Sequence, residues 1–261
     1  MRRPIVGVGR RVVLAAVLMQ PVFACALDHD NLDPNRPIAI EDAYAIPKGE
    51  IGVEAGARIE DRRQGPTRIS IQPQIIYGAF YNAQLELQGN LFSHAGTIVG
   101  SERSGDFHIG LLYNFNTETT HVPAFAVRAG VEFPTGQQSQ GVDQQYTGIL
   151  TKSFGRLRTH LNVGYTVLGA PQGQERPGTY RAIAAVSYPL GYPTSFLTTG
   201  ILGVYTRQSD IRGQRNPTGV EAGLRRQLTS RVVIDAGLGT ELYGPADRIA
   251  VMGTMGLSLG F

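Results

Sequence analysis

Apolar and polar residues alternate with a period of two through most of the chain after residue 48. Between positions 51 and 59, isoleucine, valine and alanine at the odd positions oppose Gly52, Glu54, Gly56 and Arg58 at the even ones. A period of two places successive side chains on opposite faces of a β-strand. The pattern and the turn residues between its segments predict twelve strands, near 50–59, 67–77, 82–92, 104–115, 122–133, 145–154, 157–168, 180–189, 195–206, 218–228, 231–242 and 248–261.

The length of these strands separates a membrane barrel from a soluble one. Strands of soluble proteins are usually about five or six residues long, whereas a tilted strand that crosses a bilayer has about nine to eleven. An even number of strands closed on itself leaves no unpaired edge in the lipid. We therefore expect residues 49–261 to form an all-β, antiparallel transmembrane barrel of about twelve strands in an up-and-down meander.

The connections between the predicted strands alternate in length. Long polar connections lie near 93–103, 134–144, 169–179 and 207–217, and short ones near 78–81, 155–156 and 229–230. Membrane barrels have short periplasmic turns and longer external loops. Both ends of the chain are accordingly expected on the periplasmic side of a bacterial outer membrane.

Aromatic residues gather at both ends of the predicted strands, as they do where a barrel meets the two membrane interfaces. The predicted periplasmic girdle comprises Tyr77, Phe80, Tyr81, Tyr113, Phe115, Phe154, Tyr188, Tyr192, Phe196 and Phe261. The predicted external girdle comprises Phe92, Phe107, Phe133, Tyr146, Tyr180, Tyr205 and Tyr243.

The first 26 residues read as a secretory signal peptide. Four arginines precede an apolar run at 12–19, and Ala24-Cys25-Ala26 fits a cleavage site. Two variants stay open, a lipidated Cys25 and a twin-arginine signal at Arg10-Arg11. The segment holds four of the 24 basic residues and none of the 21 acidic ones, so the remainder is nearly neutral. This removes the main reason to expect a nucleic-acid partner.

If the apolar face meets lipid, the polar face lines the lumen. The predicted pore-lining residues are Glu54, Arg58, Arg68, Glu86, His108, Arg128, Glu132, Arg158, His160, Asn162, Glu221, Arg225 and Asp235. Both signs of charge occur, which fits either a ladder of buried ion pairs that braces the barrel or a constriction that selects solutes. Residues 27–48 either hang in the periplasm or fold into the lumen as a plug, and Ile38, Ile40, Tyr44 and Ile46 favour the plug because they require burial.

Pro73 falls inside the second predicted strand, where proline cannot donate to the ladder. It marks either a tolerated bulge or a lateral gap through which an apolar solute leaves the barrel. Ser70 and Ser153 share no predicted strand with a histidine, and no serine lies two residues from His160 or Asn162. The five histidines have no metal-ligand spacing, and no Gly-Lys-Ser phosphate loop follows Gly164 and Gly169. We therefore expect no enzymatic activity, no catalytic residues, no metal and no cofactor.

Two further motifs lead to a known family. The chain resembles the transporter family named for the MetA pathway of phenol degradation in two main places, Pro123–Ala126 with Gly130–Gly136, and His160–Tyr165. Two shorter stretches are similar to the family as well: Ile40–Asp42 and Pro47–Glu50. The resemblance implies an outer-membrane barrel that admits aromatic or other hydrophobic compounds. A strand that ends on Phe261 also resembles the terminal signal that the barrel assembly machinery reads.

These observations predict a channel for passive uptake of small solutes, with membrane lipid, the assembly machinery and the solute as partners. Two alternatives stay open at this point. One is a structural or adhesion barrel that binds partners through its external loops. The other is a narrow channel for acidic oligosaccharides, which the lumen arginines favour and the interleaved glutamates oppose. Nothing in the sequence predicts the oligomeric state.

Overall fold

The computed structural model describes residues 27–94, 105–136, 140–191, 193–195 and 197–261. The predicted signal peptide, with Cys25, lies outside these residues, as do Tyr192 and Phe196 of the predicted periplasmic girdle. No helix in the described part of the chain is long and apolar enough to cross a membrane.

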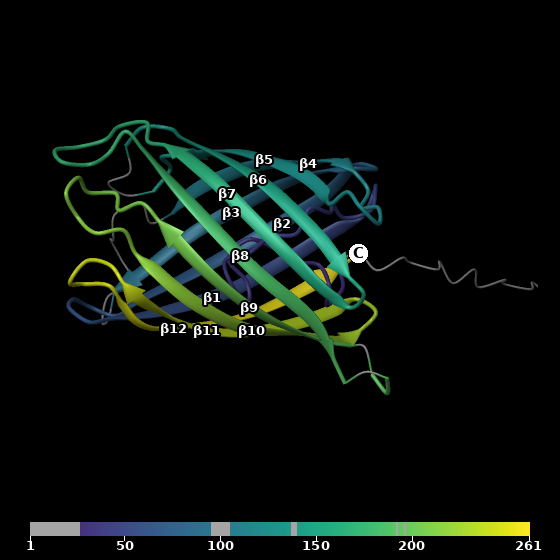
Figure 1. Ribbon diagram of the computed structural model, residues 1–261. Helices are drawn as coiled ribbons and strands as arrows, with labels where there is room; N and C mark the ends of the chain where they lie inside the picture. The colour runs from purple at the N-terminus through teal and green to yellow at the C-terminus, as the bar shows by residue number, and fades with distance from the viewer. Residues whose placement is uncertain (1–26, 95–104, 137–139, 192, 196) are drawn as a thin grey trace, which may run out of the picture.

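Twelve antiparallel strands, each paired with its neighbours in the sequence, close into a barrel (Figure 1). They are β1 (Ile51–Arg62), β2 (Arg68–Phe80), β3 (Ala83–His94), β4 (Asp106–Asn116), β5 (Ala124–Phe133), β6 (Asp143–Phe154), β7 (Leu157–Val167), β8 (Gly178–Leu190), β9 (Thr198–Arg207), β10 (Thr218–Thr229), β11 (Val232–Tyr243) and β12 (Ile249–Gly260). The predicted fold class is confirmed, and every predicted strand end lies within three residues of the observed one.

The first and last strands close the barrel. β1 pairs with β12 from Gly52 opposite Gly260 onward, and just beyond them the N–H of Phe261 donates to the carbonyl of Ile51 at 2.8 Å. The amide of Ile51 donates back to the Phe261 carbonyl at 3.0 Å. Closure therefore satisfies the backbone of both terminal strands, which the bilayer core requires.

The two ends of the barrel differ. The long connections, such as 168–177 and 208–217, lie together at one end of the barrel (Figure 1), which we call the loop end. The short turns 81–82, 155–156 and 230–231 lie at the opposite end with the carboxyl terminus, which we call the terminus end. By the usual arrangement of membrane barrels, the loop end is external and the terminus end periplasmic.

Most described girdle aromatics project outward: Phe80, Phe115 and Phe154 at the terminus end are 64%, 58% and 61% exposed. Tyr205 is an exception, and its prediction as an external girdle residue was wrong. Only 9% of Tyr205 is exposed, because it lies on the inward face of β9 and packs against Leu32, Ile38 and Ile40. Its parity along the strand, shared with the inward Gly203, carries it into the lumen.

Candidate solute pathway

Residues 27–48, here called the amino-terminal segment, lie inside the barrel. Backbone amides of the segment donate to side chains on well-separated strands: Ala39 to Glu221 on β10 at 2.7 Å, Ala43 to Thr151 on β6 at 3.0 Å, and Ile46 to Gln84 on β3 at 2.9 Å. Contacts on several sides of the wall are attainable only from within the lumen.

The apolar side chains of the segment meet three apolar patches on the inner wall. The largest surrounds Ile38 and Ile40, which are 1% and 0% exposed, and includes Leu32, Ile183, Ala185, Ile201, Tyr205, Ile249 and Met252. Ala43 packs with Leu112, Ala124, Ala126 and Ile149, and Leu27 and Ile46 pack with Ile76. Burying these side chains favours the docked position of the segment by removing apolar surface from water.

A charged cluster fastens the middle of the segment to β1, β10 and β11. The guanidinium of Arg36 contacts the Glu54 carboxylate and lies 3.1 Å from Oδ2 of Asp235. Arg225, which is fully buried, lies 3.0 Å from Asp33 and 3.6 Å from the other oxygen of Glu54. Two arginines and three carboxylates thus share one dry site, where each charge depends on its partners for compensation.

A second charged group lies on the opposite side of the wall. Nη2 of Arg128 on β5 contacts Glu86 on β3, and Nη1 lies 3.9 Å from Glu41 of the segment. Gln84 donates to the other oxygen of Glu86 at 3.0 Å. The segment is therefore held by ion pairs on two sides of the lumen.

Two of the residues predicted to line the pore, His160 and Asn162, are buried on β7. The ring of His160 bridges Thr151 on β6 and Ser187 on β8, at 3.2 and 3.0 Å, and Asn162 is 3% exposed. Arg158, closer to the terminus end, lies 3.3 Å from Asp30 of the segment. His160 is thus a hydrogen-bonded wall residue, and Arg158 is a further ion-pair partner of the segment.

The segment is also fastened at the terminus end. The hydroxyl of Tyr44 donates to Glu118 at 3.4 Å, and Lys152 and the Ser153 amide donate to the same carboxylate at about 3.0 Å. Partial burial raises the pKa of Glu118, but the hydrogen bonds from Lys152 and Ser153 outweigh it and hold the pKa below its usual value. Glu118 is therefore an anionic anchor at neutral pH.

Among the described residues, two adjoining cavities lie in the loop-end half of the lumen. One, of about 280 Å³, is lined among others by Arg58, Arg68, Glu221 and Tyr205. The other, of about 190 Å³, is lined among others by His108, Arg128 and Glu132. Asn35 of the segment and two wall residues, Gln72 and Arg181, line both cavities.

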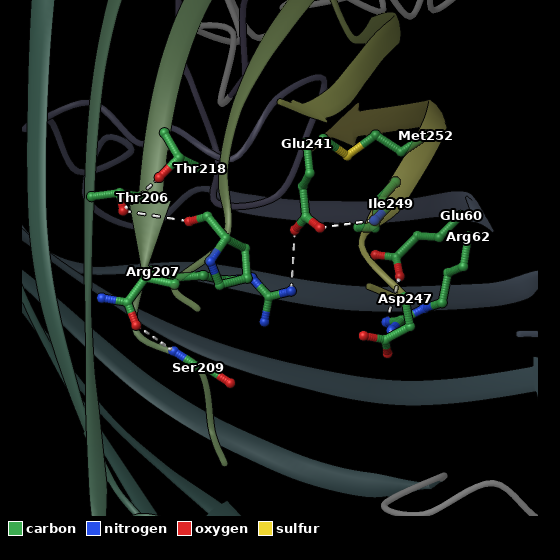
Figure 2. A network of polar contacts seen from close by, with 12 residues as sticks. Glu60, Arg62, Thr206, Arg207, Ser209, Thr218, Glu241, Asp247, Ile249 and Met252 are labelled. Carbon is green, nitrogen blue, oxygen red and sulfur yellow. Dashed lines mark hydrogen bonds and ion pairs between the residues drawn. The ribbon is translucent and has the colours of Figure 1, made fainter. Parts of the chain in front are cut away.

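A polar network, drawn in Figure 2, includes five residues that line the larger cavity: Glu60, Arg62, Arg207, Glu241 and Ile249. Arg207 donates to Glu241 at 3.2 Å, and the other oxygen of that carboxylate accepts from the Ile249 amide at 2.8 Å. Arg62 lies 3.4 Å from Glu60 and 3.3 Å from Asp247. These pairs tie β1, β9, β11 and the turn before β12 together around the cavity.

The ladder between β2 and β3 is interrupted at Pro73. Pairing runs from Arg68–His94 to Ile71–Leu91 and resumes at Gln74–Gln88 in the same register, with no pairs at Gln72 and Pro73. On its other side Pro73 stays in register opposite Ala55 of β1. The interruption is therefore local and one-sided, as the missing N–H of proline requires.

The structure distributes the predicted pore-lining residues over four places. Glu54, Arg225 and Asp235 meet in the first charged cluster, Glu86 and Arg128 in the second, and Arg158, His160 and Asn162 line β7. The remaining predicted residues border the loop-end cavities: Arg58, Arg68, His108, Glu132 and Glu221.

Sequence reasoning missed the charged residues of the segment, Asp33, Arg36 and Glu41, which compensate the wall charges. They have no strand periodicity to reveal their orientation. Their position beside the apolar residues Leu32, Ile38 and Ile40 was the available signal, because charges next to side chains that require burial are drawn into the lumen with them.

A closed barrel of twelve strands with a lipid-facing apolar exterior and a polar interior defines an outer-membrane β-barrel of the channel class. The chain belongs to the family described as "Putative MetA-pathway of phenol degradation", whose model matches residues 34–251. This confirms the resemblance seen in the sequence and the localisation to the bacterial outer membrane. A search of curated proteins finds no match.

Solved structures share this fold at low sequence identity. The COG4313 outer membrane channel from Pseudomonas putida F1 superposes with a TM-score of 0.67 at 13% identity, over 88% of this chain and 100% of that one. The NanC porin gives a TM-score of 0.56 at 13% identity, over 81% and 98% of the two chains. The KdgM porin in complex with disordered oligogalacturonate gives 0.50 at 9% identity, over 80% and 99%.

Proposed function

We propose that the protein is a passive outer-membrane channel for small, predominantly aromatic or apolar solutes, and that residues 27–48 form its plug. The observation that carries this is the occupied lumen, in which the segment leaves loop-end cavities of only about 280 and 190 Å³. Binding pockets for small molecules usually have about 300 Å³ or more, so these cavities suit solutes of about one ring.

The path beyond the cavities requires an exit, because the segment packs against the wall below them. Two routes are compatible with the geometry. The segment undocks toward the terminus end, or the solute leaves sideways at the interrupted ladder beside Pro73, whose side chain faces the lipid. The second route suits apolar solutes, because a polar solute that enters the bilayer there would lose its hydrogen bonds to water without replacement.

The small cavities weigh against a channel for acidic oligosaccharides. KdgM, whose structure holds oligogalacturonate, shares the fold, but extended oligosaccharides require a continuous open lumen. We also propose that the barrel has no catalytic activity, which is supported by the channels and porins among its structural relatives. Within the described residues no group of three or more His, Cys, Asp or Glu could hold a metal ion.

Solute swelling of proteoliposomes tests the proposal. Vesicles that contain the full processed chain are compared with protein-free vesicles across phenols, short fatty acids and sugars of increasing size. We expect swelling that depends on the protein for compounds of about one ring and a sharp loss for disaccharides and larger sugars. Equal swelling for all sugars would indicate an open porin, and no swelling with any solute, together with no current in planar bilayers, would favour an adhesion barrel.

A further inference from the structure

One row of the inner wall brings together arginines from three strands. In register across β5 to β9 the row reads Arg128, Thr147, Gly164, Arg181 and Arg207. Arg181 and Arg207 are direct cross-strand neighbours, and like charges in that position repel each other. Such a row is stable when each guanidinium has a compensating anion.

Compensation within the protein reaches only part of the row. Arg207 pairs with Glu241 at 3.2 Å (Figure 2), and Arg128 pairs with Glu86. Arg181 forms no hydrogen bond and no ion pair with any residue in the described part of the chain. The one carboxylate whose charge is found to act on Arg181 is that of Glu41, and this carboxylate lies 3.9 Å from Arg128. Arg181 is thus a guanidinium with five donors and no acceptor of its own.

The wall gives Arg181 a defined position. Its neighbour across the ladder is Gly164, and a Cβ at that glycine would lie 3.1 Å from both Cγ and Nε of Arg181. The arginine stem therefore lies flat over the glycine, with Thr147 beyond it. From there Arg181 lines both loop-end cavities.

An apolar surface lies two residue pairs below the arginines, at the next inward-facing position. Ile183 and Tyr205 are direct cross-strand neighbours that line the larger cavity with Ile249. They are 4%, 9% and 3% exposed. The buried hydroxyl of Tyr205 has no hydrogen-bond partner among the described residues, and neither has Nε of Arg128 on the row above. The cavities are thus bordered both by hydrogen-bond donors that have no acceptor among the described residues and by an apolar surface.

We propose that Arg181 is the anion-binding residue of a solute site in the loop-end cavities, which takes small monocarboxylates with an apolar body such as a single aromatic ring. The guanidinium binds the carboxylate, and the ring rests on Ile183 and Tyr205. A carboxylate matches the planar donor fork of arginine and can accept two hydrogen bonds from it. The inference rests on the proposed channel function and narrows its substrate class.

Benzoate is the probe. Benzyl alcohol, which has the ring but no charge, and acetate, which has the charge but no ring, are its matched controls. Binding is measured by titration calorimetry on the full processed chain in detergent, for wild type, Arg181→Gln, Arg181→Lys and Tyr205→Phe. Arg226→Gln serves as the charge control, because Arg226 is exposed near the terminus end of β10. Retention of the heat-modifiable folded form shows that each variant is a closed barrel.

We expect benzoate to bind wild type more tightly than acetate or benzyl alcohol. Arg181→Gln should weaken benzoate binding about tenfold or more, the loss of a charge-assisted bidentate pair. Arg181→Lys should recover part of it, Tyr205→Phe should lose a few-fold, and Arg226→Gln should match wild type. Benzoate binding that is absent, or equal in wild type and Arg181→Gln, would overturn the inference.

Ion current through planar bilayers separates this site from the channel function itself. If the wild type carries current but its benzoate binding does not depend on Arg181, the channel function is retained and the anion site is refuted. Binding that depends on Arg181 in a barrel that carries neither current nor solute would retain the anion site and refute the channel.

Discussion

Nη1 of Arg36 in the amino-terminal segment lies 3.1 Å from Oδ2 of Asp235 on β11, and both side chains are buried. The same guanidinium contacts Glu54 on β1. One residue of the segment thus joins strands on both sides of β12 within a site that excludes water. Arg36 therefore links the position of the segment to both β1 and β11.

Replacing Arg36 with alanine should release the segment. Breaking a buried ion pair from one side usually costs about 3–5 kcal/mol, because the abandoned carboxylates stay buried without compensation. We expect single-channel conductance to rise several-fold above wild type, with the barrel still folded. Arg226→Ala, at an exposed position on β10, is the control for lost charge. Unchanged conductance in a folded Arg36→Ala barrel would show that the segment does not obstruct the lumen.

A methyl group at Gly256 should have the same effect without removing any charge. The Arg36 guanidinium lies against the α-carbon of Gly256, and a Cβ there would overlap Nη1 of Arg36 and crowd Asp235. We expect Gly256→Ala to raise conductance as Arg36→Ala does. Gly253→Ala is the matched control, since its Cβ would meet only Cδ2 of Leu238 at 3.8 Å. Equal conductance in the two alanine variants would argue against displacement of the segment.

The strands were predictable from the sequence because a bilayer enforces strict alternation. Alternation of polar and apolar residues weakens where the inner wall carries apolar residues, such as Ile149 on β6. Ile149 faces inward because Ala43 of the segment packs against it. The apolar residue at this inward position therefore reflects its packing against the amino-terminal segment.

The partners of the lumen charges could not be predicted in the same way. Parity along a strand places Arg225 and Asp235 on the inner face, but the residues that compensate them come from a segment without periodicity. Closure of twelve strands around that segment decides which charge meets which. Arg181 illustrates the limit: its position along the strand predicts that it faces inward, but not that it lacks a partner among the residues the structure describes.

Cysteine labelling should separate the two faces of β2. The sequence holds a single cysteine, at position 25 in the predicted signal peptide, so introduced cysteines should be unique in the processed chain. Gln72 lines both cavities, whereas its neighbour Ile71 is 48% exposed toward the lipid. We expect Gln72→Cys to react with a charged, aqueous thiol reagent and Ile71→Cys with a lipid-soluble maleimide. The reverse preference would place the polar face outside.

Restoring the ladder at Pro73 should close the proposed lateral exit. Pro73→Ala supplies the missing N–H opposite Gly89, so that β2 and β3 can pair continuously. We expect uptake of an apolar phenol into proteoliposomes to fall several-fold, while ion conductance through the lumen stays the same. Pro123→Ala, in the turn before β5, controls for the loss of a proline. Unchanged phenol uptake by Pro73→Ala would exclude this exit.

Replacing Phe261 with alanine should impair assembly rather than stability. The ring is 57% exposed, and the contacts that close the barrel, between Phe261 and Ile51, involve only backbone atoms. The variant should therefore refold in detergent as wild type does, judged by heat-modifiable mobility. If the terminal aromatic residue is what the assembly machinery recognises, the amount of barrel inserted into the outer membrane of cells should fall severalfold.

Phe154→Ala removes an equally exposed ring, 61% by the same measure, at the same end of the barrel. Because Phe154 lies within the chain, its loss should leave assembly nearly normal, and equal defects in the two variants would assign the effect to the aromatic girdle instead.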